Sequence, residues 1–317
     1  MGQSAPLTEK NLTDQSGKVF IVTGSSGGIG KELAQILYGH NAKVYIAARS
    51  GEKSAQAIET IKQAHPESKG ELVYLHLDLA DLTTVKASAD EFLRNEKKLD
   101  VLWNNAGVMI PPQGSVTKQG YELQLGTNNL GPFLFTKFLT PILAKTAQTA
   151  PPGSVRVVWV SSSSARRTSP ATGGVDMSNL DYKIDHGHWY KYGTSKAGNI
   201  LHSSEYAKRY GKDGIISVSL DPGMLNTDLY KDMGRSLYFI VRLVALKEPI
   251  WGAYTELYGG LSTDISTKEN GVWIEPWGKK STQRKDIEQA RKTQAEGGSG
   301  VALAFWTWSE EQVAPYV

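Results

Sequence analysis

The sequence predicts an α/β fold built on one doubly wound parallel sheet. Short apolar runs that suit buried strands alternate with segments of helical periodicity along most of the chain. The first apolar run, at 19–23, leads into a glycine-rich turn and then into a helical pattern. No linker and no internal repeat divides the 317 residues. We therefore expect a single domain.

The elements follow in order along the chain. About seven strands are expected, at Val19–Thr23, Lys43–Ala47, Glu71–His76, Val101–Trp103, Val155–Ser161, Ile215–Leu220 and Gly271–Ile274. Helical segments are expected near 28–38, 52–64, 81–97, 119–146, 188–210 and 248–262. Sheets of this kind bind ligands at the carboxyl ends of their strands, so the functional site is expected there.

The two ends of the chain differ from this pattern. Residues 1–16 are polar, lack the apolar core of a signal peptide and are interpreted as an N-terminal extension. The domain is expected to span 17–278. Residues 279–317 are polar at first and then aromatic, and we interpret them as an extension that packs back on the domain as a helix. A partner-binding site is the alternative interpretation of these aromatic side chains.

Composition excludes several classes of function. The chain has no cysteine, which rules out disulfides, thiolate catalysis and zinc–thiolate sites. The net charge of +3 is too small to indicate binding to nucleic acid or to a membrane surface. The six histidines show no metal-ligand spacing, so no metal is expected. No apolar run reaches the ~18 residues of a membrane span, and we expect a soluble, cytoplasmic protein.

Tyr192 and Lys196 are the most informative pair of residues. They are four positions apart in a segment predicted to be helical, so the phenol and the ammonium lie on one face. A free phenol titrates near pH ~10. A neighbouring cation favours the phenolate and lowers that pKa, which makes the tyrosine usable as an acid or a base near neutrality. Taken alone, this spacing also arises by chance.

The glycine-rich turn predicts a phosphate-binding loop. Glycines let the backbone approach a pyrophosphate, and the N-terminus of the following helix offers free N–H groups and a positive dipole end. The spacing of Gly24, Gly28 and Gly30 is a stretched form of the usual dinucleotide-binding pattern, and any tight turn can use glycines. The candidate cofactor-binding residues here are Thr23, Gly24, Ser26, Gly28, Ile29 and Gly30.

Together these motifs resemble those of the short-chain dehydrogenase/reductase family, with a Rossmann-type sheet. The motifs, which occur in the family's order and cover roughly 17–275, are Thr23-Gly24-x-x-x-Gly28-Ile29-Gly30, Asn104-Asn105-Ala106-Gly107, Ser161-Ser162, Tyr192-x-x-x-Lys196 and Pro222-Gly223-x-x-x-Thr227. The chain is most similar to the retinol-dehydrogenase-like branch, as found in fungal NADP-dependent reductases. The stretches 44–49, 127–133 and 192–199 carry that similarity.

The resemblance implies four catalytic residues. Tyr192 is expected to give a proton to a carbonyl oxygen as hydride arrives from the nicotinamide, and Lys196 to lower the tyrosine pKa and hold the nicotinamide ribose. Ser162 is expected to orient the substrate oxygen, with Ser161 and Ser163 as competing assignments. Asn128 is expected to support a water that leads from Lys196, with Asn129 as the competitor.

The end of the second predicted strand favours NADP(H) as the cofactor. A site selective for NAD needs a carboxylate there, and this strand ends in Ala48-Arg49-Ser50. The Arg49 guanidinium suits a 2′-phosphate, with Ser50 assisting. The alternative is that Arg49 is a solvated loop charge. The resemblance adds further cofactor contacts at Asp78, Leu79, Asn105, Ala106, Gly107, Pro222, Gly223, Leu225 and Thr227.

We interpret the substrate as a ketone, aldehyde or alcohol on an apolar skeleton, and a role in secondary metabolism is one open interpretation. Residues 224–247 are expected to form a lid whose apolar face indicates a hydrophobic pocket, and the insert at 173–180 is expected to border the substrate mouth. A non-catalytic NADP(H)-binding sensor or scaffold is the alternative function. A sugar-nucleotide epimerase or dehydratase fits less well, because its glycine spacing differs. Family members often form homodimers, and that state is an open expectation here.

Overall fold

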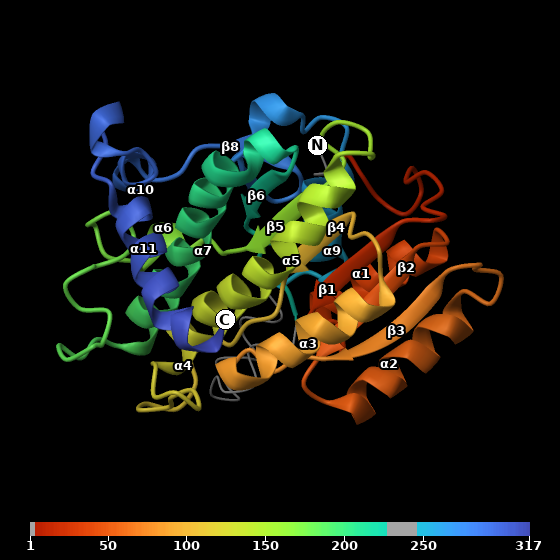
Figure 1. Ribbon diagram of the computed structural model, residues 1–317, viewed down its shortest axis with the longest axis horizontal. Coiled ribbons are helices and arrows are strands. Elements are labelled where there is room, and N and C mark those ends of the chain that lie inside the picture. Colours follow the sequence, from red (N-terminus) through yellow and green to blue (C-terminus); the bar gives the residue numbers. More distant parts are fainter. Residues whose placement is uncertain (1–3, 227–245) are drawn as a thin grey trace.

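The computed structural model describes residues 4–226 and 246–317. They form one sheet with helices on both faces (Figure 1). The sheet has eight strands in the order β3-β2-β1-β4-β5-β6-β7-β8. The strands are β1 (Val19–Thr23), β2 (Lys43–Ala48), β3 (Glu71–His76), β4 (Val101–Asn104), β5 (Arg156–Val160), β6 (Ile216–Leu220), β7 (Trp273–Glu275) and β8 (Lys279–Ser281).

The expected doubly wound α/β fold is confirmed. All strand pairs are parallel except β7 with β8, which is antiparallel. The sheet reverses its order between β1 and β4, which is the position where such folds bind dinucleotides. The central strands β1, β4, β5 and β6 are buried along their whole length, as parallel strands covered on both faces must be.

The longer helices form two layers (Figure 1). One core lies between the sheet and α3, α5 and α7, and the other lies between the sheet and α1 and α9. The helices are α1 (Gly28–Gly39), α2 (Gly51–Ala64), α3 (Leu82–Asn95), α4 (Leu123–Leu125), α5 (Gly131–Ala147), α6 (Ser164–Arg167), α7 (His188–Tyr210), α9 (Pro249–Leu261), α10 (Lys285–Ala290) and α11 (Val301–Val313). Short 3₁₀ turns occur at Gly211–Asp213, Thr267–Glu269, Gln294–Glu296 and Ala314–Tyr316.

The segment expected as one helix at 119–146 is divided in the structure. The helical part begins at α4, passes through a π-helical turn at Gly126–Leu130 and continues as α5. In a π turn the backbone hydrogen bonds span five residues instead of four, and such turns are frequent at functional sites. Here it holds Asn128 and Asn129, both buried.

The chain beyond residue 278 contributes to the sheet and to the helical layer that contains α7. β8 extends the sheet at its edge, and α11 packs along α7. The α11 contact is aromatic: His202 of α7 stacks on Phe305 with ring centroids 4.7 Å apart, and Trp306 lies edge-on to Phe133. The His202 Nε2 atom is 2.9 Å from the Ser309 hydroxyl.

The burial of His202 predicts an acid-sensitive contact between α7 and α11. Burial lowers the pKa of His202 from 6.5 to about 3. The unfolded chain therefore binds a proton that the folded chain does not, so this residue causes the free energy of unfolding to fall as the pH decreases from about 6.5 toward 3. We expect His202→Phe to flatten that dependence, as measured by urea unfolding between pH 7 and pH 4.

His76→Gln is the matched control, since His76 is exposed, and it should leave the slope unchanged. An equal slope in wild type and His202→Phe would contradict the prediction.

Candidate active site

The glycine loop between β1 and α1 packs directly against the segment that follows β4. Gly24 and Gly28 adopt positive φ angles of 71° and 55°. A Cβ atom on Gly24 would lie 2.9 Å from the Ala106 Cα atom, and one on Gly30 would lie 2.6 Å from the Asn105 amide nitrogen. Larger residues would therefore push these two segments apart.

Hydrogen bonds fix the same contact. The Asn105 side-chain amide donates to the Thr23 carbonyl at 2.6 Å, and the Ala106 N–H donates to the Thr23 hydroxyl at 2.9 Å. On its outer side the loop is open, because a Cβ atom on Gly27 would meet nothing within 4 Å. The N-terminus of α1 thus presents free N–H groups to an open space, which fits the pyrophosphate of a dinucleotide.

Tyr192 and Lys196 lie one turn apart in α7, a helix buried on all sides from Lys191 to Ala207. Small residues allow this burial: a Cβ atom on Gly193 would lie 2.4 Å from the Thr168 hydroxyl, and one on Gly198 would lie 2.7 Å from the Asn129 amide nitrogen. The Lys196 ammonium lies 5.7 Å from the centre of the Tyr192 ring. The predicted side-by-side arrangement is present.

Lys196 is held at the carboxyl end of β5. Its ammonium donates to the Val160 carbonyl at 3.1 Å, and its own carbonyl accepts a 2.6 Å hydrogen bond from the Ser161 hydroxyl. Burial lowers the pKa of Lys196 to about 8, while the negative charges of Glu256 and then Asp221 oppose that shift.

Asn128 meets Lys196 at Gly107. A Cβ atom on Gly107 would lie 3.1 Å from the Asn128 carbonyl oxygen and 3.4 Å from the Lys196 ammonium. The Asn128 side chain accepts from the Val108 N–H at 2.8 Å and donates to the Val108 carbonyl and the Ser195 hydroxyl, each at 3.0 Å. The structure therefore brings Asn128, Lys196 and the segment after β4 together.

Asn129 points elsewhere, toward the body of α7. Its amide donates at 2.8 Å to the Ser195 carbonyl and at 2.8 Å to the Asn199 side chain. These contacts join the π-helical turn to α7. Asn128, and not Asn129, lies beside Gly107.

The serines after β5 have different surroundings. Ser161 is buried, and its hydroxyl is bound to α7. Ser162 is half-buried, and its hydroxyl accepts from the Ser164 N–H at 3.1 Å, which leaves the hydroxyl proton to another acceptor. Ser163 precedes α6, and its side chain makes no capping hydrogen bond.

The predicted cofactor residues after β2 and β3 lie at the ends of their strands. Arg49 follows β2 and is exposed. No hydrogen bond or ion pair to its guanidinium is found within 4–226 and 246–317. Ser50 caps α2, its hydroxyl accepting from the Lys53 N–H at 3.2 Å. Asp78 accepts from the Ala80 N–H at 2.9 Å, and Leu79 is buried.

The segment after β6 is described only in part. Gly223 has a φ of 92°, and its N–H donates to the Asp221 carboxylate at 3.0 Å. Leu225 pairs with Lys247 in an isolated bridge, so the two ends of the predicted lid at 224–247 meet. Thr227 lies outside the described residues. So do the apolar residues that form the face of the predicted lid, which are Leu237, Phe239, Ile240, Leu243 and Val244.

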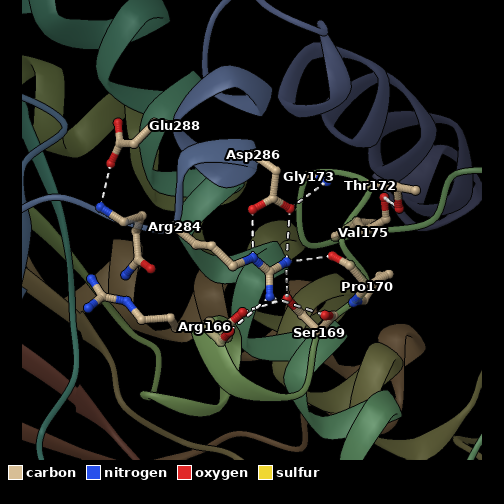
Figure 2. A network of polar contacts seen from close by, with 11 residues as sticks. Arg166, Ser169, Pro170, Thr172, Gly173, Val175, Arg284, Asp286 and Glu288 are labelled. Carbon is tan, nitrogen blue, oxygen red and sulfur yellow. Dashed lines mark hydrogen bonds and ion pairs between the residues drawn. The ribbon is translucent and has the colours of Figure 1, made fainter.

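A network of polar contacts binds the insert between Ser162 and Tyr192 to the C-terminal extension (Figure 2). Arg284 forms a two-pronged ion pair with Asp286, at 2.6 and 2.9 Å, and donates to the carbonyls of Arg166 and Pro170 at 2.8 and 2.6 Å. The Asp286 carboxylate in turn accepts from the Gly173 N–H at 3.0 Å. The hydrogen bond from Arg284 lowers the pKa of Asp286. This link was not predicted, because Arg284 and the insert are far apart in the sequence.

A cavity of about 150 Å³ lies beside the insert. Its walls come from the segment after β4, at 111–116, and from Tyr182, His188 and Lys191. Lys191 is buried and paired with Asp185 at 2.6 Å. Both polar and apolar residues line this cavity.

Glu256 of α9 is a fully buried acid that the sequence analysis did not single out. One signal in the sequence could have identified it. Helical spacing places Glu256 on the same face as Gly252, Gly259 and Gly260.

Comparisons with known proteins show which family the chain belongs to. Residues 18–174 match the family described as short chain dehydrogenase. The chain is 52% identical over 319 residues to a short-chain dehydrogenase/reductase of Phomopsis amygdali, covering 99% of this chain and 95% of that protein. It is 50% identical over 315 residues to one of Emericella nidulans, covering 98% and 97%. The fold is similar to that of a protein from Mycobacterium Paratuberculosis, with a TM-score of 0.70, 25% identity and 97% of each chain covered.

The chain therefore belongs to the short-chain dehydrogenase/reductase family. Members of this family are oxidoreductases that act on small molecules, and their fold binds a nicotinamide cofactor. No helix within the described residues has the length and apolar character needed to cross a bilayer.

The Arg284 network predicts that the C-terminal extension holds the insert in place. In Arg284→Gln we expect faster hydrogen–deuterium exchange at 166–175, because the hydrogen bonds to the carbonyls of Arg166, Ser169 and Pro170 and the ion pair with Asp286 are lost. The expected loss in free energy of unfolding is about 1–3 kcal/mol. Exchange measured by mass spectrometry tests this.

Lys183→Ala serves as the control, since it breaks an exposed ion pair to Asp181 in the same insert and should change little. Unchanged exchange at 166–175 in Arg284→Gln would show that Arg284 does not hold the insert in place.

Proposed function

We propose that this protein is an NADP(H)-dependent carbonyl reductase, with Tyr192 as the proton donor. The observation that carries this is the meeting of Lys196 and Asn128 beside Gly107, with the Tyr192 ring 5.7 Å from the Lys196 ammonium. Bound NADPH would supply the hydride. The remaining roles fall to side chains of this protein.

Tyr192 gives its proton to the carbonyl oxygen of the substrate, and the adjacent ammonium stabilises the phenolate that remains. Ser162 orients the same oxygen through its hydroxyl proton. Lys196, fixed by the Val160 carbonyl, keeps further N–H donors for the nicotinamide ribose. Asn128, held by Val108 and Ser195, supports a water through which the proton of Tyr192 is restored.

The choice of NADP(H) rests on Arg49. The guanidinium is exposed at the end of β2, and Ala48 and Ser50 on either side carry no charge. A planar guanidinium binds a phosphate through two parallel hydrogen bonds, whereas no carboxylate is present here for a ribose 2′-hydroxyl. Ser50, which caps α2, assists Arg49 in binding the 2′-phosphate. Asp78 and Leu79 contact the adenine of the cofactor.

The substrate class is proposed as a ketone or aldehyde on an apolar skeleton. Its support is the predicted apolar face of the lid at 224–247, and the insert at 173–180 is proposed to border the substrate mouth. A cytoplasmic location, a homodimer and a role in secondary metabolism stay predictions from the sequence. A sensor that binds NADP(H) without turnover is the competing function, and turnover distinguishes the two.

Tyr192→Phe tests the assignment of the acid. We expect the rate of NADPH oxidation with a panel of apolar ketones and aldehydes to fall by about 10²–10⁴-fold, since the proton donor is removed. Binding of NADPH, followed by its fluorescence, should persist in both proteins. Equal turnover in the two proteins would rule out Tyr192 as the acid, and tight binding without turnover in either would favour the sensor.

Arg49→Ala tests the choice of cofactor. Hydrogen bonds to a charged group contribute about 1.5–3 kcal/mol, so we expect the Kd for NADPH to rise by about 10–100-fold while the Kd for NADH barely changes. Lys62→Ala, an exposed cation at the far end of α2, is the matched control. A parallel loss of both affinities would show that Arg49 does not read the phosphate.

A further inference from the structure

Trp189 is a large aromatic side chain that is exposed beside the proposed proton donor. It belongs to the first turn of α7, and 46% of its surface is exposed. Tryptophan is highly buried on average in proteins, because its rings have a large apolar surface. The exposure of this side chain therefore raises the question of what covers it in the working protein.

Most of the large apolar side chains that are exposed among the described residues come from the segments around this site. Val116 follows β4, Ile184 lies in the insert after β5, and Met224 follows β6. The others, Leu303 and Val317, lie in the C-terminal extension. A single exposed apolar residue needs no explanation. A group of them on segments that leave the carboxyl ends of the strands indicates an apolar ligand at that edge.

Trp189 shares one face of α7 with Tyr192 and Lys196. The spacing of three and then four residues places the three side chains along one stripe of the helix. The Trp189 and Tyr192 rings lie edge to face with their centroids 6.3 Å apart, and the Lys196 ammonium is 5.7 Å from the centre of the Tyr192 ring. Tyr192 and Lys196 are buried, whereas Trp189 is exposed. The stripe therefore leads from the core, past the proposed acid, to the surface.

The neighbours of Trp189 in the same turn face other parts of the molecule. His188 and Lys191 line the cavity of about 150 Å³. Tyr190 stacks on His186 with ring centroids 4.0 Å apart. Trp189 thus differs from these neighbours in lying beside Tyr192.

The first turn of α7 is tied to two other segments. The Lys191 ammonium lies 2.6 Å from the Asp185 carboxylate, which also accepts a 2.7 Å hydrogen bond from the Gln113 side chain. These contacts join the turn to the insert and to the segment after β4. The backbone that carries Trp189 is therefore fixed before a ligand arrives, which lowers the entropy that is lost when a ligand packs against the indole.

We propose that Trp189 is a specificity-determining residue whose indole packs against a flat, conjugated ring of the substrate. This inference deepens the proposed reductase function and rests on it. The substrate oxygen must reach Tyr192, and Lys196, on the core side of Tyr192, is proposed to hold the nicotinamide ribose. The body of the substrate therefore extends along the stripe in the opposite direction and meets Trp189. Aromatic rings favour other flat rings in stacked or edge-to-face contact, so an aryl ketone or aldehyde fits this position best.

The first test compares two ketones with the same carbon skeleton, the flat acetylnaphthalene and its saturated counterpart acetyldecalin. Trp189→Ala removes an apolar surface, so we expect the KM for acetylnaphthalene to rise by about 10–100-fold. The preference for acetylnaphthalene, taken as the ratio of the two kcat/KM values, should fall by about 3–10-fold. The kcat values should change little, because the contact is the same in the bound substrate and in the transition state. Trp189→Phe should restore most of the preference.

Tyr190→Ala is the matched control, since it removes an aromatic ring from the same turn of α7 but from the side that faces His186. It should leave the preference unchanged. An unchanged KM in Trp189→Ala, or an equal change for the two ketones, would overturn the proposal. An equal fall of the preference in Tyr190→Ala would mean that loosening of the turn is the cause, and would overturn it as well.

The second test needs no turnover. NADP⁺ cannot reduce a ketone, so calorimetric titration of acetylnaphthalene into the protein, with and without NADP⁺, measures binding alone. We expect the Kd to be about 10–100-fold higher in Trp189→Ala than in wild type or Tyr190→Ala. If Trp189→Ala does not fold, Trp189→Leu keeps the apolar bulk without the aromatic face and replaces it in both tests.

Equal Kd values, or no binding of acetylnaphthalene to wild type, would overturn the proposal even if the enzyme reduces other carbonyl compounds. A raised Kd in Trp189→Ala would support the proposal even if neither ketone is reduced. Failure of this proposal and failure of the proposed function can therefore be told apart.

Discussion

The joint between α7 and the end of β5 is the constraint on which the rest of the site depends. Val160 accepts hydrogen bonds from both Lys196 and Asn199, and the Ser161 hydroxyl donates back to the Lys196 carbonyl. These three bonds fix the rotation and the height of α7 on the sheet. Tyr192 lies one turn before Lys196 in α7, and Ser162 lies one residue beyond the joint.

The joint requires a helix that can be buried on every side, and this explains the composition of α7. Bulky side chains would not fit against Thr168 or Asn129, where Gly193 and Gly198 lie. Small polar residues need hydrogen-bond partners once buried. Ser195 finds these in Asn128 and the Tyr192 carbonyl. The same bonds that satisfy the helix thus orient Asn128 beside Lys196.

Sequence patterns predicted those parts of the structure that depend on neighbours along the chain. The strands Val19–Thr23 and Glu71–His76 and the helix at 188–210 lie where periodicity indicated. β8 could not be found in this way, because Lys279–Ser281 is short, charged and partly exposed, and pairs only through β7. The π turn at Asn128 was also missed, since tertiary hydrogen bonds to Val108 and Ser195 stabilise it rather than local propensity.

The Arg284 network could not be predicted from local sequence. Arg284 reaches the insert from beyond the last parallel strand, with hydrogen bonds to the carbonyls of Arg166 and Pro170 and an ion pair to Asp286. These hydrogen bonds join segments more than one hundred residues apart in the sequence, and the residues around Arg284 have the pattern of an ordinary turn. The motifs at 23–30 and 192–196 are each contiguous in the sequence. The position of the insert, in contrast, depends on how the C-terminal part of the chain packs against it.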